Sequence, residues 1–272
     1  MKSITLRANG GLSVVSAFAT GKGGACSVDL PMEVTVSMSH GVTQQDGIRN
    51  IIEFLAERKI ARGNYSVSIT SMIPEANGLK SSSALVLSVI YGILKLEGIS
   101  MSDADLLEIS AEASIANGTS VTGAVDDLAA CLYGGYCLTD NREHIVKRRG
   151  KLGNQSVIIV PRRERKILSS TIRIAPSGNL QDCFLRAYSM AENGNIYGAM
   201  EMNGFIMGAY TGIDFAGIGS LLRRGALYAS QSGKGPALFA IFPASELIDP
   251  MGFGDCIFTH FADEGIQVVE EH

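Results

Sequence analysis

A polar turn runs directly into a long apolar segment at residues 73–98, IPEANGLKSSSALVLSVIYGILKLEG. Pro74 holds the residue before it in an extended conformation and has no N–H to donate to a sheet, so a strand over 65–70 ends before it. The apolar run over about 82–97 has the length of a helix. These features predict a strand–loop–helix unit whose loop holds Gly78, Lys80 and a run of serines.

The start of this predicted helix is a candidate anion site. Helix N-termini expose unpaired N–H groups and carry a partial positive charge, which favours phosphate. Ser81, Ser82 and Ser83 would add hydroxyls in the first turn, and Lys80 would add a positive charge. The alternative is that Ser81 only caps the helix. We favour the phosphate site because a self-capped helix needs neither Gly78 nor Lys80, although no GxxxxGK[ST] loop is present.

The order of the predicted elements indicates an α+β protein. Strands are expected early in the chain and most helices later, with a change of pattern near residue 150. We therefore expect two lobes, 1–150 and 151–272. The predicted strands are 3–8, 12–18, 32–38, 65–70, 156–161, 236–242 and 266–270, and the predicted helices are 44–59, 82–97, 102–115, 124–133, 179–192, 195–210, 216–230 and 245–263.

Composition excludes several classes of protein. A net charge of −4 argues against general nucleic-acid binding, which requires a basic surface. No run of about 20 apolar residues could cross a membrane, and no apolar signal region follows the first residues. Five cysteines without a CxxC pair and four histidines without ligand spacing predict neither a zinc site nor a disulfide framework. We expect a cytoplasmic protein that binds neither membranes nor nucleic acids.

A second polar segment, SAEASIANGTSVTGAVDDLAACLYGG at 110–135, contains carboxylates suited to phosphoryl transfer. Transfer to an alcohol requires a divalent metal to neutralise the phosphates, and a carboxylate often accepts the hydroxyl proton. Glu112, Asp126 and Asp127 are the candidates. The alternative is that the two aspartates only charge the first turn of a helix, where acidic residues are favoured.

Three motifs, in order along nearly the whole chain, resemble those of the GHMP small-molecule kinases. PEANGLKSSSA (74–84) is similar to their Pro-x3-Gly-Leu-Gly-Ser-Ser-Ala loop, ATGKGGACSVDLP (19–31) to their first motif, and SGKGPALFAIF (232–242) to their third. GLKSSSA, TGKGGACSVDLP and TGAVDDLAACLYGG together most resemble the archaeal-type shikimate kinases. The resemblance implies the two-lobed GHMP kinase fold, with an N-terminal lobe like ribosomal protein S5 domain 2 and a C-terminal ferredoxin-like lobe.

The resemblance also implies where ATP and Mg²⁺ bind. The metal would lie between Ser82 and Glu112, although a one-residue gap in the alignment would move the first role to Ser83. Lys80 departs from the family pattern, which has glycine at that position. The glycine turn near residue 233 would pack beside the phosphate loop, the alternative being a simple helix C-cap. The expected ATP-binding residues are Pro74, Glu75, Ala76, Asn77, Gly78, Leu79, Lys80, Ser81, Ser82, Ser83, Ala84, Gly233 and Gly235.

For catalysis the resemblance implies one aspartate and one lysine. Counting back from Gly134 selects Asp127 as the catalytic aspartate, whereas counting forward from Gly123 selects Asp126; we favour Asp127 and keep both. Lys22 matches the active-site lysine of mevalonate kinase and would stabilise the transferring phosphate or lower the pKa of the attacking hydroxyl. Its alternative is an exposed lysine in a turn.

The expected activity is ATP- and Mg²⁺-dependent phosphorylation of the 3-hydroxyl of shikimate, on the route to chorismate and the aromatic amino acids. A homoserine or mevalonate-type kinase of the same fold is the alternative, and a non-catalytic ligand sensor on the same scaffold is a further one. Shikimate carries a carboxylate, for which Arg7, Arg223 and Arg224 are possible partners. The oligomeric state is left open, with a homodimer as one option.

Overall fold

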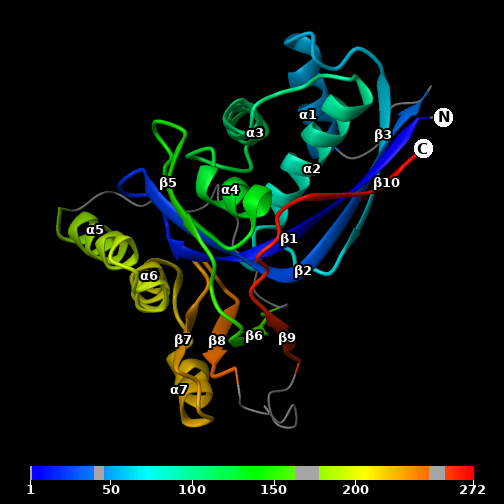
Figure 1. Cartoon of the computed structure of the whole chain (residues 1–272). Coiled ribbons are helices and arrows are strands. Elements are labelled where there is room, and N and C mark those ends of the chain that lie inside the picture. Colours follow the sequence, from blue (N-terminus) through cyan, green and yellow to red (C-terminus); the bar gives the residue numbers. More distant parts are fainter. Residues whose placement is uncertain (1, 40–45, 163–177, 245–254) are drawn as a thin grey trace.

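The computed structural model describes residues 2–39, 46–162, 178–244 and 255–272. These residues form an α+β fold with two antiparallel sheets (Figure 1). The first sheet has the order β10-β1-β2-β4-β5, with β3 also paired to β2, and the second has the order β7-β8-β6-β9. The strands are β1 (Ser3–Val15), β2 (Lys22–Ser39), β3 (Asn64–Ser71), β4 (Tyr136–Asp140), β5 (Ile145–Gly150), β6 (Ser156–Val160), β7 (Tyr228–Gln231), β8 (Leu238–Phe242), β9 (Ile257–His260) and β10 (Gln267–Glu271).

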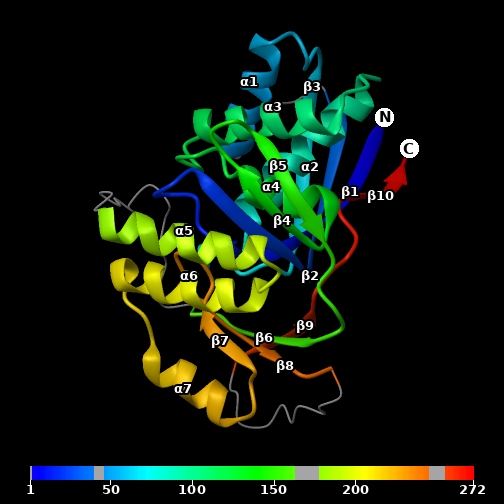
Figure 2. The ribbon, with the colours of Figure 1, turned by 60° about the vertical axis from the view of Figure 1, so that its left-hand side comes forward.

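Helices cover both faces of the first sheet (Figure 2). On one face α2 and α4 pack against β1 and β2, and α1 and α3 lie outside them; on the other face lie α5 and α6. Helix α6 also contacts β7, so it joins the two sheets, and α7 packs on β7 and β8. The helices are α1 (Asp46–Glu57), α2 (Ser81–Leu96), α3 (Asp103–Ala116), α4 (Val125–Tyr133), α5 (Gly178–Glu192), α6 (Ile196–Thr211) and α7 (Phe215–Arg223).

Strand β1 changes character along its length. Its first half alternates between partly buried and fully buried residues, and everything from Gly10 onward is buried. The alternation reflects a sheet covered on one face, and the continuous burial reflects helices on both faces. The apolar run of α2 is explained in the same way, because strands cover one side of this helix and other helices the remaining sides.

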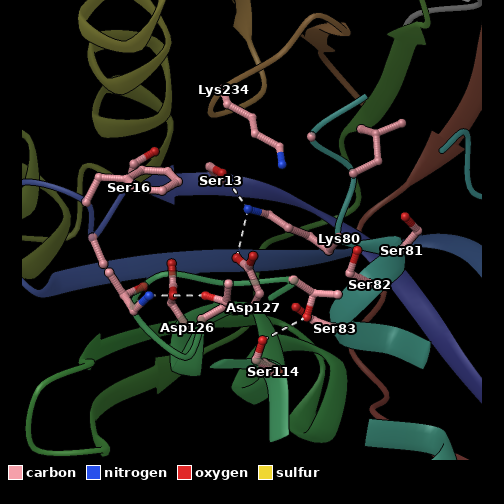
Figure 3. A pocket seen from close by; sticks show the side chains of 18 of the residues that line it. Ser13, Ser16, Lys80, Ser81, Ser82, Ser83, Ser114, Asp126, Asp127 and Lys234 are labelled. Carbon is pink, nitrogen blue, oxygen red and sulfur yellow. Dashed lines mark hydrogen bonds and ion pairs between the residues drawn. The ribbon is translucent and has the colours of Figure 1, made fainter. Parts of the chain in front are cut away.

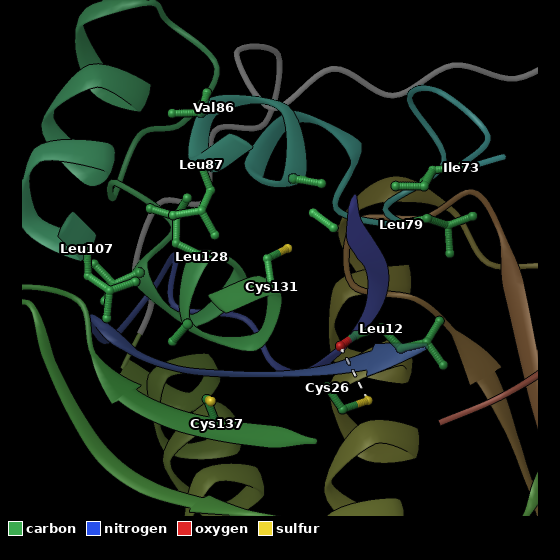
Figure 4. Packing of buried hydrophobic residues seen from close by; sticks show 14 of the residues in the cluster. Leu12, Cys26, Ile73, Leu79, Val86, Leu87, Leu107, Leu128, Cys131 and Cys137 are labelled. Carbon is green, nitrogen blue, oxygen red and sulfur yellow. Dashed lines mark hydrogen bonds between the residues drawn. The ribbon is translucent and has the colours of Figure 1, made fainter. Parts of the chain in front are cut away.

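The predicted strand–loop–helix unit is present as β3, a loop and α2. Ile73 and Leu79 anchor the loop in the core, with 4% and 1% of their surface exposed (Figure 4). The polar residues next to them are therefore presented by a loop that is held at both ends.

Two predicted early strands, 3–8 and 12–18, are one strand. The glycine pair Gly10–Gly11 does not turn the chain; it lets another segment approach closely. The Gly11 N–H donates to the Leu79 carbonyl at 3.1 Å, and a Cβ at Gly10 would lie 3.0 Å from the same oxygen. The glycines thus allow the loop to pack directly on β1.

The predictions for the C-terminal part were less accurate. The predicted helix 216–230 ends at Arg223, because Gly225 takes the left-handed conformation that terminates helices, and Tyr228 begins β7. In the predicted helix 245–263, residues 245–254 lie outside the described residues, and Ile257–His260 is a strand. Strands β4 and β5 were not predicted; Gly134–Gly135 ends the helix as expected, and β4 follows at once.

The two-lobed architecture is confirmed, whereas the division at residue 150 stays a prediction. Strand β5 ends at Gly150 and β6, in the second sheet, begins at Ser156. The last strand, β10, returns to the first sheet beside β1. Within the described ranges, no helix has the length and apolar character needed to span a membrane.

Candidate active site

A cavity lies where α2 and α4 begin, beside the end of β1 (Figure 3). Its walls come from the end of β1 and the following residues up to Phe18, from the loop before α2, and from the segment between α3 and α4. Lys234, from the turn between β7 and β8, completes it. The phosphate loop, the third motif and the acidic segment therefore meet at one cavity, and Gly23 of the first motif lies beside Asp126.

Neither helix that begins at the cavity is capped by the side chain of its N-cap residue. The N-cap of α2 is Lys80, not Ser81, and the N-cap of α4 is Ala124; neither makes a side-chain cap hydrogen bond. By contrast, Ser102, Asn195 and Asp214 cap α3, α6 and α7 with their side chains. The first-turn N–H groups of α2 thus remain available to an anion, as the phosphate-site hypothesis requires.

Backbone strain is concentrated at the cavity. Ala76, Lys80 and Ala124 have positive φ angles of 53°, 69° and 53°, and all three line the cavity. Such conformations are costly for residues other than glycine and persist where the surroundings impose them, often at functional sites.

The turn of the third motif packs against the phosphate loop. The Ser232 hydroxyl donates to the Gly78 carbonyl at 2.9 Å, and the Ala237 N–H donates to the Asn77 carbonyl at 3.3 Å. A Cβ at Gly78 would lie 2.4 Å from the Ser232 carbonyl oxygen. The expected packing of this turn beside the loop is therefore present, and it brings Lys234 to the cavity.

Replacing Gly78 by alanine tests this close packing. Gly78→Ala is expected to lower the free energy of unfolding by at least about 3 kcal/mol, because it adds a backbone clash to the strain of a positive φ. Gly98→Ala is the matched control: φ is 67° there and no atom lies within 4 Å of a Cβ. The control isolates the cost of the φ angle, about 1 kcal/mol. Denaturant unfolding measures both, and equal losses would show that the contact is not needed.

Asp127 forms an ion pair with Lys80 inside the cavity. Lys80 Nζ lies 2.7 Å from Asp127 Oδ1 and 2.6 Å from the Ser13 hydroxyl oxygen. The two side chains are only 10% and 18% exposed. Burial by itself would lower the pKa of Lys80, but the negative charges of Asp127 and Asp126 outweigh it and raise that pKa. Lys80 is therefore a charged, buried partner of Asp127.

Asp126 has a different environment from its neighbour. It is 5% exposed, and the Asn141 amide donates to its Oδ1 at 2.8 Å. Burial, assisted by the charge of Asp127, raises the pKa of Asp126 to about 7 even though Lys80 opposes the shift. Burial therefore disfavours the charged form of Asp126, whereas Asp127 is the aspartate that contacts Lys80.

In the first motif, Gly23 lies against Asp126, whereas Lys22 does not line the cavity. A Cβ at Gly23 would lie 2.8 Å from the Asp126 carboxyl carbon, so this glycine makes room for the aspartate. Side chains alternate between the faces of a strand, so Lys22 points to the opposite face. Its Nζ lies 5.3 Å from the ring centroid of Tyr188 on α5, and Lys22 does not line the cavity.

The loop residues expected to bind ATP fall into two groups. Ala76 and residues 78–83 line the cavity, whereas Pro74, Glu75, Asn77 and Ala84 do not. Asn77 instead ties the loop to the second lobe: its Oδ1 accepts from the Arg162 N–H at 2.8 Å. Gly233 and Gly235 shape the turn that presents Lys234, which lines the cavity in their place.

The predicted metal ligands are not brought together. Ser82 and Ser83 line the cavity, and Ser83, the more buried of the two, points toward Ser114 (Figure 3). Glu112 lies outside the cavity lining and forms an ion pair with Arg58 at 2.9 Å. The described residues contain no cluster of three histidine, cysteine or acidic side chains that could hold a metal alone. Mg²⁺ needs no such cluster when phosphates supply most of its ligands, so the loop hydroxyls fit it.

Several residues of the cavity were not predicted. Ser13, Ser16 and Lys234 line it, and Asn141 positions Asp126 from behind. Lys234 lies between Gly233 and Gly235, which were both predicted to bind ATP, so its position in that turn could have indicated a place in the site. Burial and the positive charge of Lys80 lower the pKa of Lys234 to about 8. The possible carboxylate partners Arg7, Arg223 and Arg224 do not line the cavity, and Arg7 lies 3.6 Å from Asp29.

Comparison with known proteins places the chain in a family. Residues 47–135 match the GHMP kinases N terminal domain. Over 271 residues the chain is 38% identical to a shikimate kinase of Thermoplasma acidophilum, covering 98% of both chains, and it is 30% identical to a shikimate kinase of Pyrococcus abyssi, covering 93% of this chain and 97% of the other. A crystal structure of homoserine kinase from Cytophaga hutchinsonii has the same fold, with a TM-score of 0.74, 20% identity and coverage of 98% and 97%. The chain therefore belongs to the GHMP kinase family, as a relative of the archaeal-type shikimate kinases.

Proposed function

We propose that the protein is a shikimate kinase, which transfers the γ-phosphoryl group of ATP to the 3-hydroxyl of shikimate. The observation that carries the proposal is a single cavity holding both an uncapped helix start and an ion-paired aspartate. The first suits the phosphates of a nucleotide and the second suits the proton of an alcohol. The similarity to shikimate kinases over nearly the full chain supports shikimate as that alcohol.

The ATP phosphates would lie on the backbone N–H groups of residues 81–83, with Lys80 and Lys234 on either side. Mg²⁺, when bound with ATP, would neutralise negative charge on the phosphates. Ser82 or Ser83 would hold it, and Glu112 would join them only after leaving Arg58. Most of the rate enhancement would come from positioning and charge neutralisation.

In the transfer step the 3-hydroxyl oxygen of shikimate forms a bond to the γ-phosphorus, and the bond to the β-phosphate oxygen breaks to release ADP. Asp127 accepts the hydroxyl proton. Its carboxylate lies 2.7 Å from Lys80 Nζ, and this ion pair would hold it in position to accept the proton. Asp126, held by Asn141, would support the turn that carries Asp127.

A coupled assay of ADP release tests the proposal. The purified chain is supplied with ATP, Mg²⁺ and, in parallel, shikimate, homoserine or mevalonate. We expect turnover with shikimate at a typical enzyme rate of roughly 1–100 per second and background rates with the other two. Turnover with shikimate no faster than background would rule out shikimate as the acceptor. A preference for homoserine or mevalonate would establish the alternative kinase. The cytoplasmic location and the homodimer remain predictions.

A further inference from the structure

Lys80 occupies a backbone conformation that is unfavourable for lysine. Its φ and ψ angles are 69° and 18°, in the left-handed region that glycine enters freely. The corresponding loop position in the GHMP pattern is a glycine. This conformation costs backbone free energy in a lysine, and interactions of the side chain must offset that cost.

The surroundings of Lys80 are built around its ammonium group. Nζ contacts the Asp127 carboxylate and the Ser13 hydroxyl, and the side chain is nine-tenths buried. The stem passes over β1 at Gly11, where a Cβ would lie 3.2 Å from Lys80 Cγ. A glycine in one strand thus makes room for a lysine that reaches an aspartate 47 residues farther along the chain, on another helix.

We propose that Lys80, rather than Lys22, is the lysine of the phosphoryl-transfer reaction. This inference rests on the proposed function. It gives Lys80 a part in the chemical step, in addition to its place in the phosphate loop. Lys80 holds the carboxylate of Asp127 in place before the reaction. It then stabilises the negative charge of the phosphoryl group during transfer.

The chemistry of the step fits this double role. When the hydroxyl oxygen bonds to phosphorus, its proton passes to Asp127, which becomes neutral. Lys80 remains protonated and loses the charge that it was balancing. Its ammonium is then available to the phosphoryl oxygens, which carry the negative charge that remains. No additional proton or co-reactant is needed.

Lys22 is not placed for this role. Gly23 faces Asp126, so the strand turns the neighbouring lysine to the opposite face, toward Tyr188. Lys22 is the first residue of β2, and its pairing with Asp140 of β4 fixes the side of the strand on which it lies.

Lys80→Gly is the decisive variant, because glycine favours the backbone that the loop already has. We expect kcat to fall by roughly 100-fold, while KM for ATP changes by less than about 5-fold since the N–H groups of the helix start remain. Lys59→Gly is the matched control: Lys59 is an exposed lysine with a φ angle of 60°, away from the cavity, and we expect its kcat to be unchanged. Lys22→Met is expected to keep a kcat at least about 10-fold above that of Lys80→Gly.

Thermal unfolding of four chains tests the pairing without any assay of activity: the wild type, Lys80→Gly, Asp127→Asn and the double variant. We expect Lys80→Gly to melt at a lower temperature than the wild type, because a buried carboxylate loses its partner. Adding Asp127→Asn to it should raise the melting temperature, since no charge is then left unpaired. Independent effects of the two substitutions would overturn the pairing.

The kinetic result separates a catalytic lysine from a structural one. A Lys80→Gly chain that melts early but keeps its kcat within about 3-fold of the wild type would overturn the inference, as would an equal loss in Lys22→Met. If the wild-type chain phosphorylates none of the acceptors, the proposed function fails, whereas the melting cycle still decides whether Lys80 and Asp127 act as a pair.

Discussion

Asp127→Asn is expected to lower kcat for phosphoryl transfer by about 10²–10⁴-fold, the range for loss of a positioned general base. Asparagine keeps the size of the side chain but can neither accept the hydroxyl proton nor balance the charge of Lys80. Steady-state kinetics with the best acceptor and ATP measure the change. We expect KM for the acceptor to change far less than kcat, because the lost interaction develops only during transfer.

The neighbouring substitution Asp126→Asn is the control for this result. Both aspartates lie in the first turn of α4, but Asp126 is the more buried and is held by the Asn141 amide. An asparagine can accept the same hydrogen bond, so this variant should retain a much larger share of kcat. If Asp126→Asn loses more activity than Asp127→Asn, the base is Asp126, as counting forward from Gly123 suggested.

Asp126→Asn is also expected to change the dependence of stability on pH. The pKa of Asp126 is about 7 in the folded protein and the ordinary value is 3.8. Between these values the folded protein holds a proton that the unfolded chain has already released. Raising the pH through this window therefore lowers the free energy of unfolding of the wild type. Asparagine does not titrate, so the variant lacks this loss.

The expected size follows from the same pKa values. From about pH 5 to about pH 8 the wild type should lose about 2–3 kcal/mol relative to Asp126→Asn. Denaturant unfolding at both pH values measures the difference, because titrating groups that do not interact with Asp126 contribute equally to both proteins. Asp182→Asn, at an exposed position on α5, provides the control and should follow the wild type. If the free energy of unfolding changes equally with pH in Asp126→Asn and the wild type, burial does not raise the pKa of Asp126.

Local patterns predicted much of the N-terminal lobe. Pro74 and the apolar run after Ser83 defined a strand end and a helix because both signals act within a few residues. The same reasoning failed where context decides: Gly10 and Gly11 look like a turn but lie inside a strand, because another loop packs on them. Strand β4 follows directly on a helix-ending glycine pair and carries no turn signal of its own.

The chain's sequence alone determined that a glycine- and serine-rich loop begins a buried helix, that an acidic pair begins another, and that the motifs resemble those of GHMP kinases. The tertiary structure alone decided which side chains meet there. Lys22 lies toward Tyr188 because side chains alternate between the two faces of a strand. Lys80 contacts Asp127 because the starts of α2 and α4 lie side by side. Contacts between residues so distant in the chain depend on strand register and helix packing, which no local pattern encodes.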